Sequence, residues 1–189
     1  MRRLYALLVI VTVMGLMAPT QARAEGFVNP WLGVNFGHDP AEGRAAFGAA
    51  AGYMGAGVFG AEFDFGYSPS FFGTENDFGS NNVMTAMGNL IVGIPIGGTT
   101  GGGVRPYVTG GIGLIRTDIN GLFDEGGYSQ NDFGFNLGAG IMGFFNDHFG
   151  IRGDVRYFRN ANESADDDEL DLELGDFDFW RAYVGLVIR

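Results

Sequence analysis

The sequence predicts an all-β protein: an eight-stranded antiparallel up-and-down transmembrane β-barrel that follows a cleaved signal peptide. Three observations lead to this fold class: an export leader, eight segments with a two-residue period, and connections that alternate between short and long. Residues 58–67, VFGAEFDFGY, show the period clearly, because Phe59, Phe63 and Phe65 share one face and the other face is small or acidic. Alternation of this kind is typical of a β-strand with two different surroundings.

The N-terminal residues 1–24 have the layout of a secretory signal peptide. Two arginines precede an apolar run over residues 4–18, and the Ala-Arg-Ala of residues 22–24 is a small-x-small cleavage site. The apolar run is shorter than the roughly 20 residues that a membrane-spanning helix needs. We therefore expect cleavage before Glu25, export from the cytoplasm, and a single barrel domain over residues 25–189.

The composition excludes several classes of protein. The chain has no Cys, so disulfides, thiol nucleophiles and Cys-based metal sites are ruled out. All 11 basic residues are Arg, and loss of the leader removes three of them, which changes the formal net charge from −11 to −14. A nucleic-acid partner does not fit such a charge. The 34 Gly also argue against a helical protein, because Gly destabilises a helix by about 1 kcal/mol per residue.

Eight segments of the expected mature chain carry the strand pattern. They are residues 31–38, 44–55, 58–67, 82–94, 106–116, 132–145, 151–159 and 177–189. Most of them are roughly 9–13 residues long, whereas strands of globular proteins average about 5–6. A tilted transmembrane strand needs about 9–11 residues, so the lengths favour a membrane barrel over a soluble sandwich.

The connections between these segments alternate in length. Short connections are expected at residues 55–57, 95–105 and 146–150, and long polar loops at residues 68–81, 117–131 and 160–176, with a brief first loop at 39–43. Short turns on one side and long loops on the other are typical of outer-membrane barrels. In this orientation Phe59, Phe63 and Phe65 face lipid, whereas Glu62 and Asp64 face the lumen.

Aromatic residues gather near the ends of the expected strands. Those on the short-turn side are Trp31, Tyr53, Phe144 and Phe149, and those on the long-loop side are Tyr67, Phe133, Tyr157, Phe177 and Trp180. Two such girdles belong at the two membrane interfaces. The alternative is that these side chains form the core of a soluble, lipocalin-like barrel.

Six charged residues have the parity of the inner face. They are Glu62, Asp64, Arg152, Asp154, Arg156 and Arg181, three acids and three Arg. An unpaired charge in a narrow lumen costs several kcal/mol, so we expect the three Arg to pair with the three acids as a lumen charge network. This network forms either a structural plug or the lining and gate of a small pore.

The pattern of the chain resembles a known family. The leader, the eight strands, RPYVTGGIGLIR (105–116) and the closing FWRAYVGLVIR (179–189) are similar to the small outer-membrane β-barrels, which include the OmpA membrane domain, OmpX and the opacity-type surface proteins. The resemblance covers the whole mature chain. It implies an outer-membrane location in a Gram-negative cell, a monomer, and insertion by the barrel-assembly machinery. Family members usually end on an aromatic residue that this machinery reads, whereas this chain ends on Arg189.

The residues that could carry chemistry do not combine into a site. His38 lies beside Asp39 at a loop end, His148 lies in a turn on the opposite side, and every Ser outside the leader is expected in a loop. No nucleophile, base and orienting group can be assembled from them. We therefore predict no enzyme, no cofactor and no metal site. The acidic segment 163–176 lacks the spaced ligands and the Gly of an EF-hand loop, and divalent cations that bridge it to lipopolysaccharide are the functional alternative to a solvated loop.

Two functions remain open at this point. The first is a structural or surface-interaction role, similar to that of an adhesin or surface antigen, with host or cell-surface ligands bound through loops 68–81, 117–131 and 160–176. The second is a small pore for ions or small solutes. The length of the loops favours the first, and partners in both cases include outer-membrane lipid and lipopolysaccharide.

Overall fold

The computed structural model describes residues 24–37, 43–71, 80–120, 128–161 and 177–189. These residues form eight strands: β1 Ala24–Phe36, β2 Arg44–Gly55, β3 Phe59–Pro69, β4 Ser80–Gly93, β5 Gly103–Asn120, β6 Tyr128–Phe144, β7 Phe149–Asn160 and β8 Asp178–Ile188. Among the residues that the structure describes, no helix is long and apolar enough to span a membrane.

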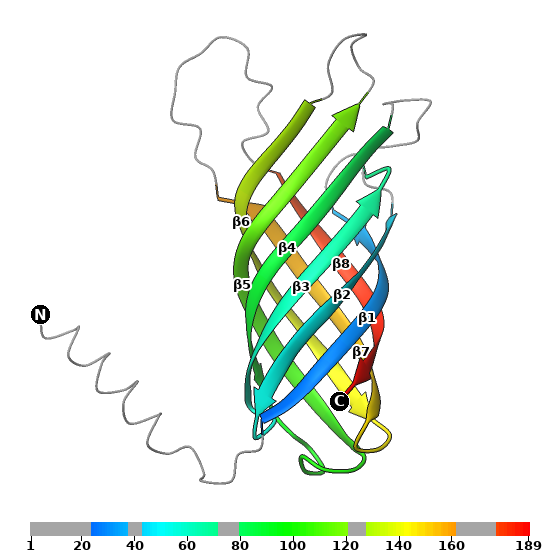
Figure 1. Cartoon of the computed structure of the whole chain (residues 1–189), viewed down its shortest axis with the longest axis vertical. Helices are drawn as coiled ribbons and strands as arrows, with labels where there is room; N and C mark the ends of the chain where they lie inside the picture. Colours follow the sequence, from blue (N-terminus) through cyan, green and yellow to red (C-terminus); the bar gives the residue numbers. More distant parts are fainter. Residues whose placement is uncertain (1–23, 38–42, 72–79, 121–127, 162–176) are drawn as a thin grey trace, which may run out of the picture.

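The strands form one closed antiparallel barrel in sequence order (Figure 1). Each strand pairs with the next, and β8 pairs with β1 through contacts such as Leu32 with Val184. The three connections β2–β3, β4–β5 and β6–β7 lie at the lower end of the barrel in Figure 1. The eight-stranded barrel fold predicted from the sequence is confirmed.

Several strands are longer than the pattern predicts. β1 begins at Ala24 rather than residue 31, and Pro30 lies where the β1–β8 pairing is interrupted between Val28 and Trp31. A Pro has no N–H to donate to a neighbouring strand. For this reason the sequence around Pro30 did not predict that β1 begins before residue 31. β5 and β6 run through residues 117–120 and 128–131, which the sequence placed in a loop. The polar residues of these two segments are compatible with strands that continue beyond the membrane into water.

The connections at the lower end are tight. Ala56 and Gly57 both have positive φ (50° and 68°), and Val58 N donates to Gly55 O at 3.0 Å, which closes the β2–β3 hairpin. Two consecutive residues with positive φ are typical of the hairpin turn whose twist matches the strands. In the β4–β5 connection, Ile96 forms a bridge with Val104, so the short connection expected over residues 95–105 contains a paired position of its own.

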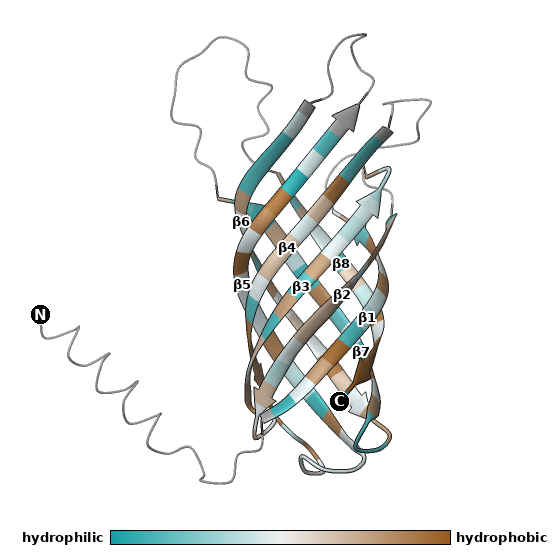
Figure 2. Ribbon diagram, in the orientation of Figure 1, coloured by the Kyte–Doolittle hydropathy of each residue, from teal (hydrophilic) through white to brown (hydrophobic). Residues whose placement is uncertain are grey.

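The outer face of the barrel is apolar, as the two-residue period predicts. Phe63 is 57% exposed at the middle of β3, and Leu90, Val108, Leu137 and Val184 are exposed on other strands. Glu62 and Asp64 are buried inside. Hydrophobic and hydrophilic positions alternate along the strands in Figure 2. The lumen is therefore the polar side of the wall.

The aromatic girdles were predicted only in part. Trp31, Phe144 and Phe177 are buried rather than outward-facing. Trp31 and Phe144 lie at inward positions of their strands, and Phe177 directly precedes β8 and contacts the rings of Phe71 and Phe179. The outward members, Tyr53, Phe133, Phe149 and Trp180, are exposed near the strand ends. The gathering of aromatic residues near strand ends did not show which of them point inward. Their odd or even position along each strand would have shown it.

Side chains fill the lumen at three levels. A lower cluster contains Phe27, Met54, Ile91, Tyr107, Met142, Phe144 and Val187. An upper cluster contains Phe71, Val83, Met87, Ile115, Phe158, Phe177 and Phe179. Between them lie the buried charged residues Glu62, Asp64, Arg152, Asp154, Arg156 and Arg181, so an ionic layer is enclosed by two hydrophobic ones.

Candidate functional site: the charged layer of the lumen

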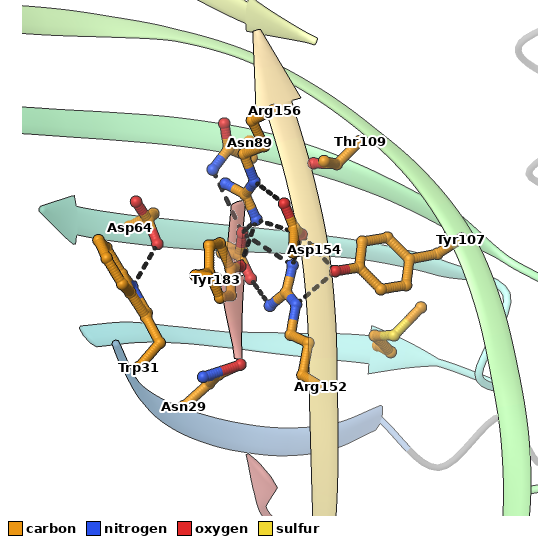
Figure 3. A network of polar contacts seen from close by, with 12 residues as sticks. Asn29, Trp31, Asp64, Asn89, Tyr107, Thr109, Arg152, Asp154, Arg156 and Tyr183 are labelled. Carbon is orange, nitrogen blue, oxygen red and sulfur yellow. Dashed lines mark hydrogen bonds and ion pairs between the residues drawn. The ribbon is translucent and has the colours of Figure 1, made fainter. Parts of the chain in front are cut away.

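The charged layer is built from opposite walls of the barrel. Glu62 comes from β3, and Arg152, Asp154 and Arg156 come from β7, four strands further around the closed sheet. The alternation of β7 places residues 152, 154 and 156 on one inward row, because successive side chains of a strand point to opposite faces. Glu62 reaches Arg152 and Arg156 across the lumen. Figure 3 shows Arg152, Asp154 and Arg156 close together, with Tyr107 beside them.

Four charged groups form a closed cluster of ion pairs. Arg156 Nη2 lies 2.7 Å from Glu62 Oε1, and Arg156 Nε lies 2.8 Å from Asp154 Oδ1. Arg152 Nη1 pairs with Glu62 Oε2, and Arg152 Nη2 lies 3.0 Å from Asp154 Oδ2. Each Arg therefore contacts both carboxylates. All four side chains are at most 1% exposed, so solvent does not screen the cluster.

Two tyrosines complete the hydrogen bonding of this cluster. Tyr107 Oη donates to Asp154 and accepts a hydrogen bond from Arg152 Nε at 2.5 Å. Tyr183 Oη accepts a hydrogen bond from Arg156 Nη2 at 2.9 Å. The Arg152 guanidinium also lies 4.7 Å from the centre of the Tyr107 ring, a cation–π distance. The sequence analysis gave neither tyrosine a role, although the inward parity that both share with the three Arg was an available signal.

A glycine on β6 makes room for the cluster. Gly138 pairs with Arg156 in the β6–β7 register. A Cβ at position 138 would lie 2.6 Å from Arg156 Cγ, which is closer than carbon atoms can approach. The absence of a side chain here lets the Arg156 stem lie along the wall, and this explains one of the many inward glycines.

The third predicted pair is not formed. Arg181 makes no ion pair with any carboxylate among the residues that the structure describes; its Nε donates to Asn35 Oδ1 at 2.8 Å and its Nη1 to Thr85 Oγ1 at 2.9 Å. Asp64 accepts a hydrogen bond from Trp31 Nε1 at 3.1 Å instead. The expectation of three matched pairs is therefore wrong for Arg181 and Asp64. Parity placed both in the lumen, but it could not show that neutral donors and acceptors would serve as partners.

Aromatic rings surround the Arg181 guanidinium. Its carbon lies 4.7 Å from the centre of the Phe158 ring, 5.2 Å from Trp31 and 5.5 Å from Phe179. The negative faces of the rings stabilise the cation at these distances. Arg181 thus joins the ionic layer to the upper aromatic cluster.

Comparison with known proteins gives one family and several related structures. The family model "Outer membrane protein beta-barrel domain" matches residues 8–186. The chain belongs to this family. A search of curated proteins finds no match.

Solved structures agree with this family in fold. The N-terminal β-barrel of Pseudomonas aeruginosa OprF is 17% identical with a TM-score of 0.58, over 88% of this chain and 97% of that one. Neisserial surface protein A (NspA) is 11% identical with a TM-score of 0.66, over 87% and 97%. Ail of Yersinia pestis, solved with the heparin analogue sucrose octasulfate, is 12% identical with a TM-score of 0.56, over 87% and 97%. The chain is an outer-membrane β-barrel protein similar to these surface proteins in fold.

The structure describes only some of the residues considered for catalysis. His148 is exposed in the β6–β7 turn, and His38 and Asp39 are outside the described residues. Ser68 is not in a loop, as the sequence suggested, but is buried in β3. Its hydroxyl donates to Ala45 O and accepts from Asn35 Nδ2, both at 2.8 Å. Within the described part of the chain, no group of three side chains could hold a metal ion. The acidic segment 163–176 lies wholly outside the residues that the structure describes.

A second charged group closes the lower end of this outer-membrane barrel. Arg189 Nη1 donates to Glu25 Oε2 at 3.0 Å and to Thr99 O at 3.2 Å, and its Nη2 donates to Asn146 O at 3.1 Å. The guanidinium also lies 3.6 Å from the centre of the Phe144 ring. Arg189 therefore links the start of β1 to two of the three lower connections.

Proposed function

We propose that the protein is a monomeric outer-membrane barrel with a closed lumen that acts at the cell surface through its loops. The observation that carries the proposal is the paired ionic cluster of Glu62, Arg152, Asp154 and Arg156, which crosses the lumen between two hydrophobic layers. A lumen filled in this way favours a structural plug over a transport path. The loops are then the part of the molecule that is left to bind partners.

The closed lumen is tested by electrical recording. The parent protein, reconstituted in planar phospholipid bilayers, should give no steady conductance above that of bilayers treated with detergent alone. A barrel protein of known conductance serves as the positive control for insertion. Stable, reproducible current steps from the parent protein would overturn the closed lumen.

A small pore is the second candidate, and one observation favours it. Among the described residues, Arg156 Nη1 and Arg181 Nη2 are buried without a hydrogen-bond partner. Buried donors of this kind usually bind water, and a chain of waters is what a conducting lumen needs. The pore candidate forecasts that neutralising Arg156 changes ion preference and hardly affects stability, which is the opposite of the forecast for a plug.

The loops suggest the chemistry of a surface ligand. Ail was solved with a sulfated heparin analogue, which shows that a barrel of this fold can present a ligand site. In this chain, the connection over residues 160–176 contains eight acidic residues and no basic one. Such a loop repels sulfated glycans and suits cationic partners, or lipopolysaccharide bridged by divalent cations.

Loop replacement tests the surface role. Cells that display the protein should bind host cells or a cationic surface more strongly than cells without it. Replacing residues 162–175 with a Gly/Ser segment of equal length should remove this binding. The matched control replaces residues 72–79 in the same way. Equal binding by displaying and non-displaying cells would rule out the adhesin-like role.

The processing of the chain is also part of the proposal. We propose that the leader is removed before Glu25, which leaves residues 25–189 as the barrel domain inserted by the barrel-assembly machinery. Two contacts support this boundary: among the described residues, Glu25 is the first whose side chain pairs with the barrel, through Arg189 at 3.0 Å and Arg105 at 3.5 Å. Intact mass measurement of protein from outer membranes tests it, because cleavage elsewhere changes the mass.

A further inference from the structure

The lower end of the barrel holds two arginines that share one carboxylate. Arg105 Nη2 lies 3.5 Å and Arg189 Nη1 lies 3.0 Å from the same atom, Glu25 Oε2. Both guanidinium groups also lie near the Phe144 ring, with distances from their carbons to the ring centre of 5.1 Å and 3.6 Å. Among the residues that the structure describes, no other side-chain carboxylate is within ion-pair distance of either group. One negative charge therefore serves two positive ones.

Arg105 is the less well compensated of the two arginines. It is only 3% exposed, its contact with Glu25 is long, and its Nη1 reaches the Met54 sulfur at 3.5 Å, which is a weak acceptor. Within the described part of the chain, its Nε is buried without a hydrogen-bond partner, and so is the Nε of Arg189. Buried polar atoms are nearly always hydrogen-bonded in native proteins, so these two free donors require an acceptor.

The short turns hold both guanidinium groups in place. Gly57 of the β2–β3 turn lies against Arg105: a Cβ there would be 2.7 Å from Arg105 Nη2, so a larger residue would push the guanidinium away. Arg189 donates to Thr99 O at 3.2 Å and to Asn146 O at 3.1 Å, in the other two short connections. Donors that are fixed before a ligand arrives bind it at a lower cost in entropy.

Water alone does not balance this group of charges. A water molecule accepts hydrogen bonds from N–H donors, but it brings no negative charge to two buried cations. Because a buried charge without a partner is costly, an anion would supply both the acceptor and the missing charge. Glu25 is 20% exposed, so a solute can approach from the aqueous side of the lower end. This end carries the short turns, which face the periplasm in outer-membrane barrels.

We propose that Arg105 and Arg189 bind a small oxyanion beside Glu25, either free phosphate or the carboxylate of a periplasmic solute. The free donors belong to two separate guanidinium groups, so the ligand must accept hydrogen bonds from two directions, which an anion with two or more oxygens does. Guanidinium groups match the geometry of carboxylates and phosphates. Glu25 is then a competitor of the ligand, because its carboxylate occupies the same two cations.

Phosphorus NMR of inorganic phosphate tests this site. The protein is purified from outer membranes in octyl glucoside, an uncharged detergent, at constant ionic strength in sodium chloride. We expect the parent to broaden the phosphate signal saturably. Arg105→Gln should weaken phosphate binding by about fivefold or more, because charge-assisted hydrogen bonds are lost. Glu25→Gln should tighten it by about threefold or more, because a competing negative charge is removed.

Exchange of the chloride for acetate distinguishes the two sources of the oxyanion. Acetate that weakens phosphate binding shows that carboxylates share the site, whereas acetate without effect assigns the site to phosphate. The matched control is Arg116→Gln, since Arg116 lies on the same strand but is exposed and pairs with Asp118; this variant should bind phosphate as the parent does.

Several outcomes would overturn the proposal. They are a parent that does not broaden the signal saturably, equal affinity of the parent and Arg105→Gln, equal loss in Arg116→Gln, or weaker binding by Glu25→Gln. The first of these would leave water as the partner of the free donors. The shift in gel mobility between unheated and boiled samples shows which variants are folded. If Arg105→Gln does not fold, Arg189→Gln removes the other free donor and carries the same forecast.

Discussion

Neutralising Arg156 is the sharpest test of the ionic layer. Its guanidinium is fully buried and bonds to Glu62 at 2.7 Å, to Asp154 at 2.8 Å and to Tyr183 at 2.9 Å. Arg156→Met keeps much of the stem and removes the charge. Glu62 and Asp154 then share Arg152 alone, with one excess negative charge in the lumen. Removing one partner of a buried ion pair typically costs about 3–5 kcal/mol, and we expect a loss of unfolding free energy in this range.

A double-mutant cycle separates pairing from other effects of the substitution. Glu62→Gln alone leaves an excess of positive charge, and we expect it to be destabilising as well. In the double variant Arg156→Met with Glu62→Gln, the remaining Arg152 and Asp154 are a matched pair. The double variant should therefore be more stable than the sum of the singles predicts, by about 1–3 kcal/mol.

The assay is urea unfolding of protein folded into phospholipid vesicles. Trp31, which donates to Asp64 inside the lumen, reports on the barrel by its fluorescence. Arg116→Met is the matched control, because Arg116 is an exposed Arg that pairs with Asp118 above the ionic layer; its midpoint should equal that of the parent. A midpoint of Arg156→Met equal to that of the parent, or strictly additive losses in the cycle, would refute the reasoning. Either result would indicate a hydrated lumen in which each charge is solvated separately.

Three further changes probe other parts of the barrel. Phe63→Arg should block assembly, because Arg near the bilayer midplane costs about 2–4 kcal/mol; the yield of heat-shifted protein on gels measures this, and normal yield would mean that the lipid face is misassigned. Arg189→Ala should lower the unfolding free energy by about 1–3 kcal/mol through the loss of its hydrogen bonds, and hydrogen exchange should increase at residues 96–104 but not in the upper half of β4. The unmodified protein should migrate faster unheated than boiled, and a protein recovered without detergent from the periplasm would contradict the membrane barrel.

The fold could be predicted because the two-residue period is a property of each strand alone. Phe59, Phe63 and Phe65 alternate with Gly60, Glu62 and Asp64 whatever the rest of the chain does, and the structure places the two sets on opposite faces. Strand ends were less predictable. The polar side chains of β5 and β6 above the membrane can hydrogen-bond to water equally well in a strand or in a loop. Composition therefore does not show where the strand ends.

The membership of the charged layer could be predicted, but its pairing could not. Parity placed six charged residues in the lumen, and all six are buried. Which of them meet depends on the stagger of strands on opposite walls, because Glu62 and Arg156 are 94 residues apart. The single-chain pattern contains no information on that stagger. Nor does it show that aromatic rings and amides would solvate Arg181 without a carboxylate.

The difference between the two arginine environments bears on how the lumen is closed. Arg152 and Arg156 are bound by carboxylates from both walls, so moving either one breaks two ion pairs at once. Arg181 is bound by Asn35, Thr85 and three rings, and its displacement breaks hydrogen bonds to neutral acceptors and cation–π contacts but no ion pair. Hydrogen bonds of an Arg to neutral acceptors are weaker than those to a carboxylate, in which both partners are charged. If the lumen opens at all, the upper level around Arg181 should yield first, and the ionic cluster below it should remain the barrier to ions.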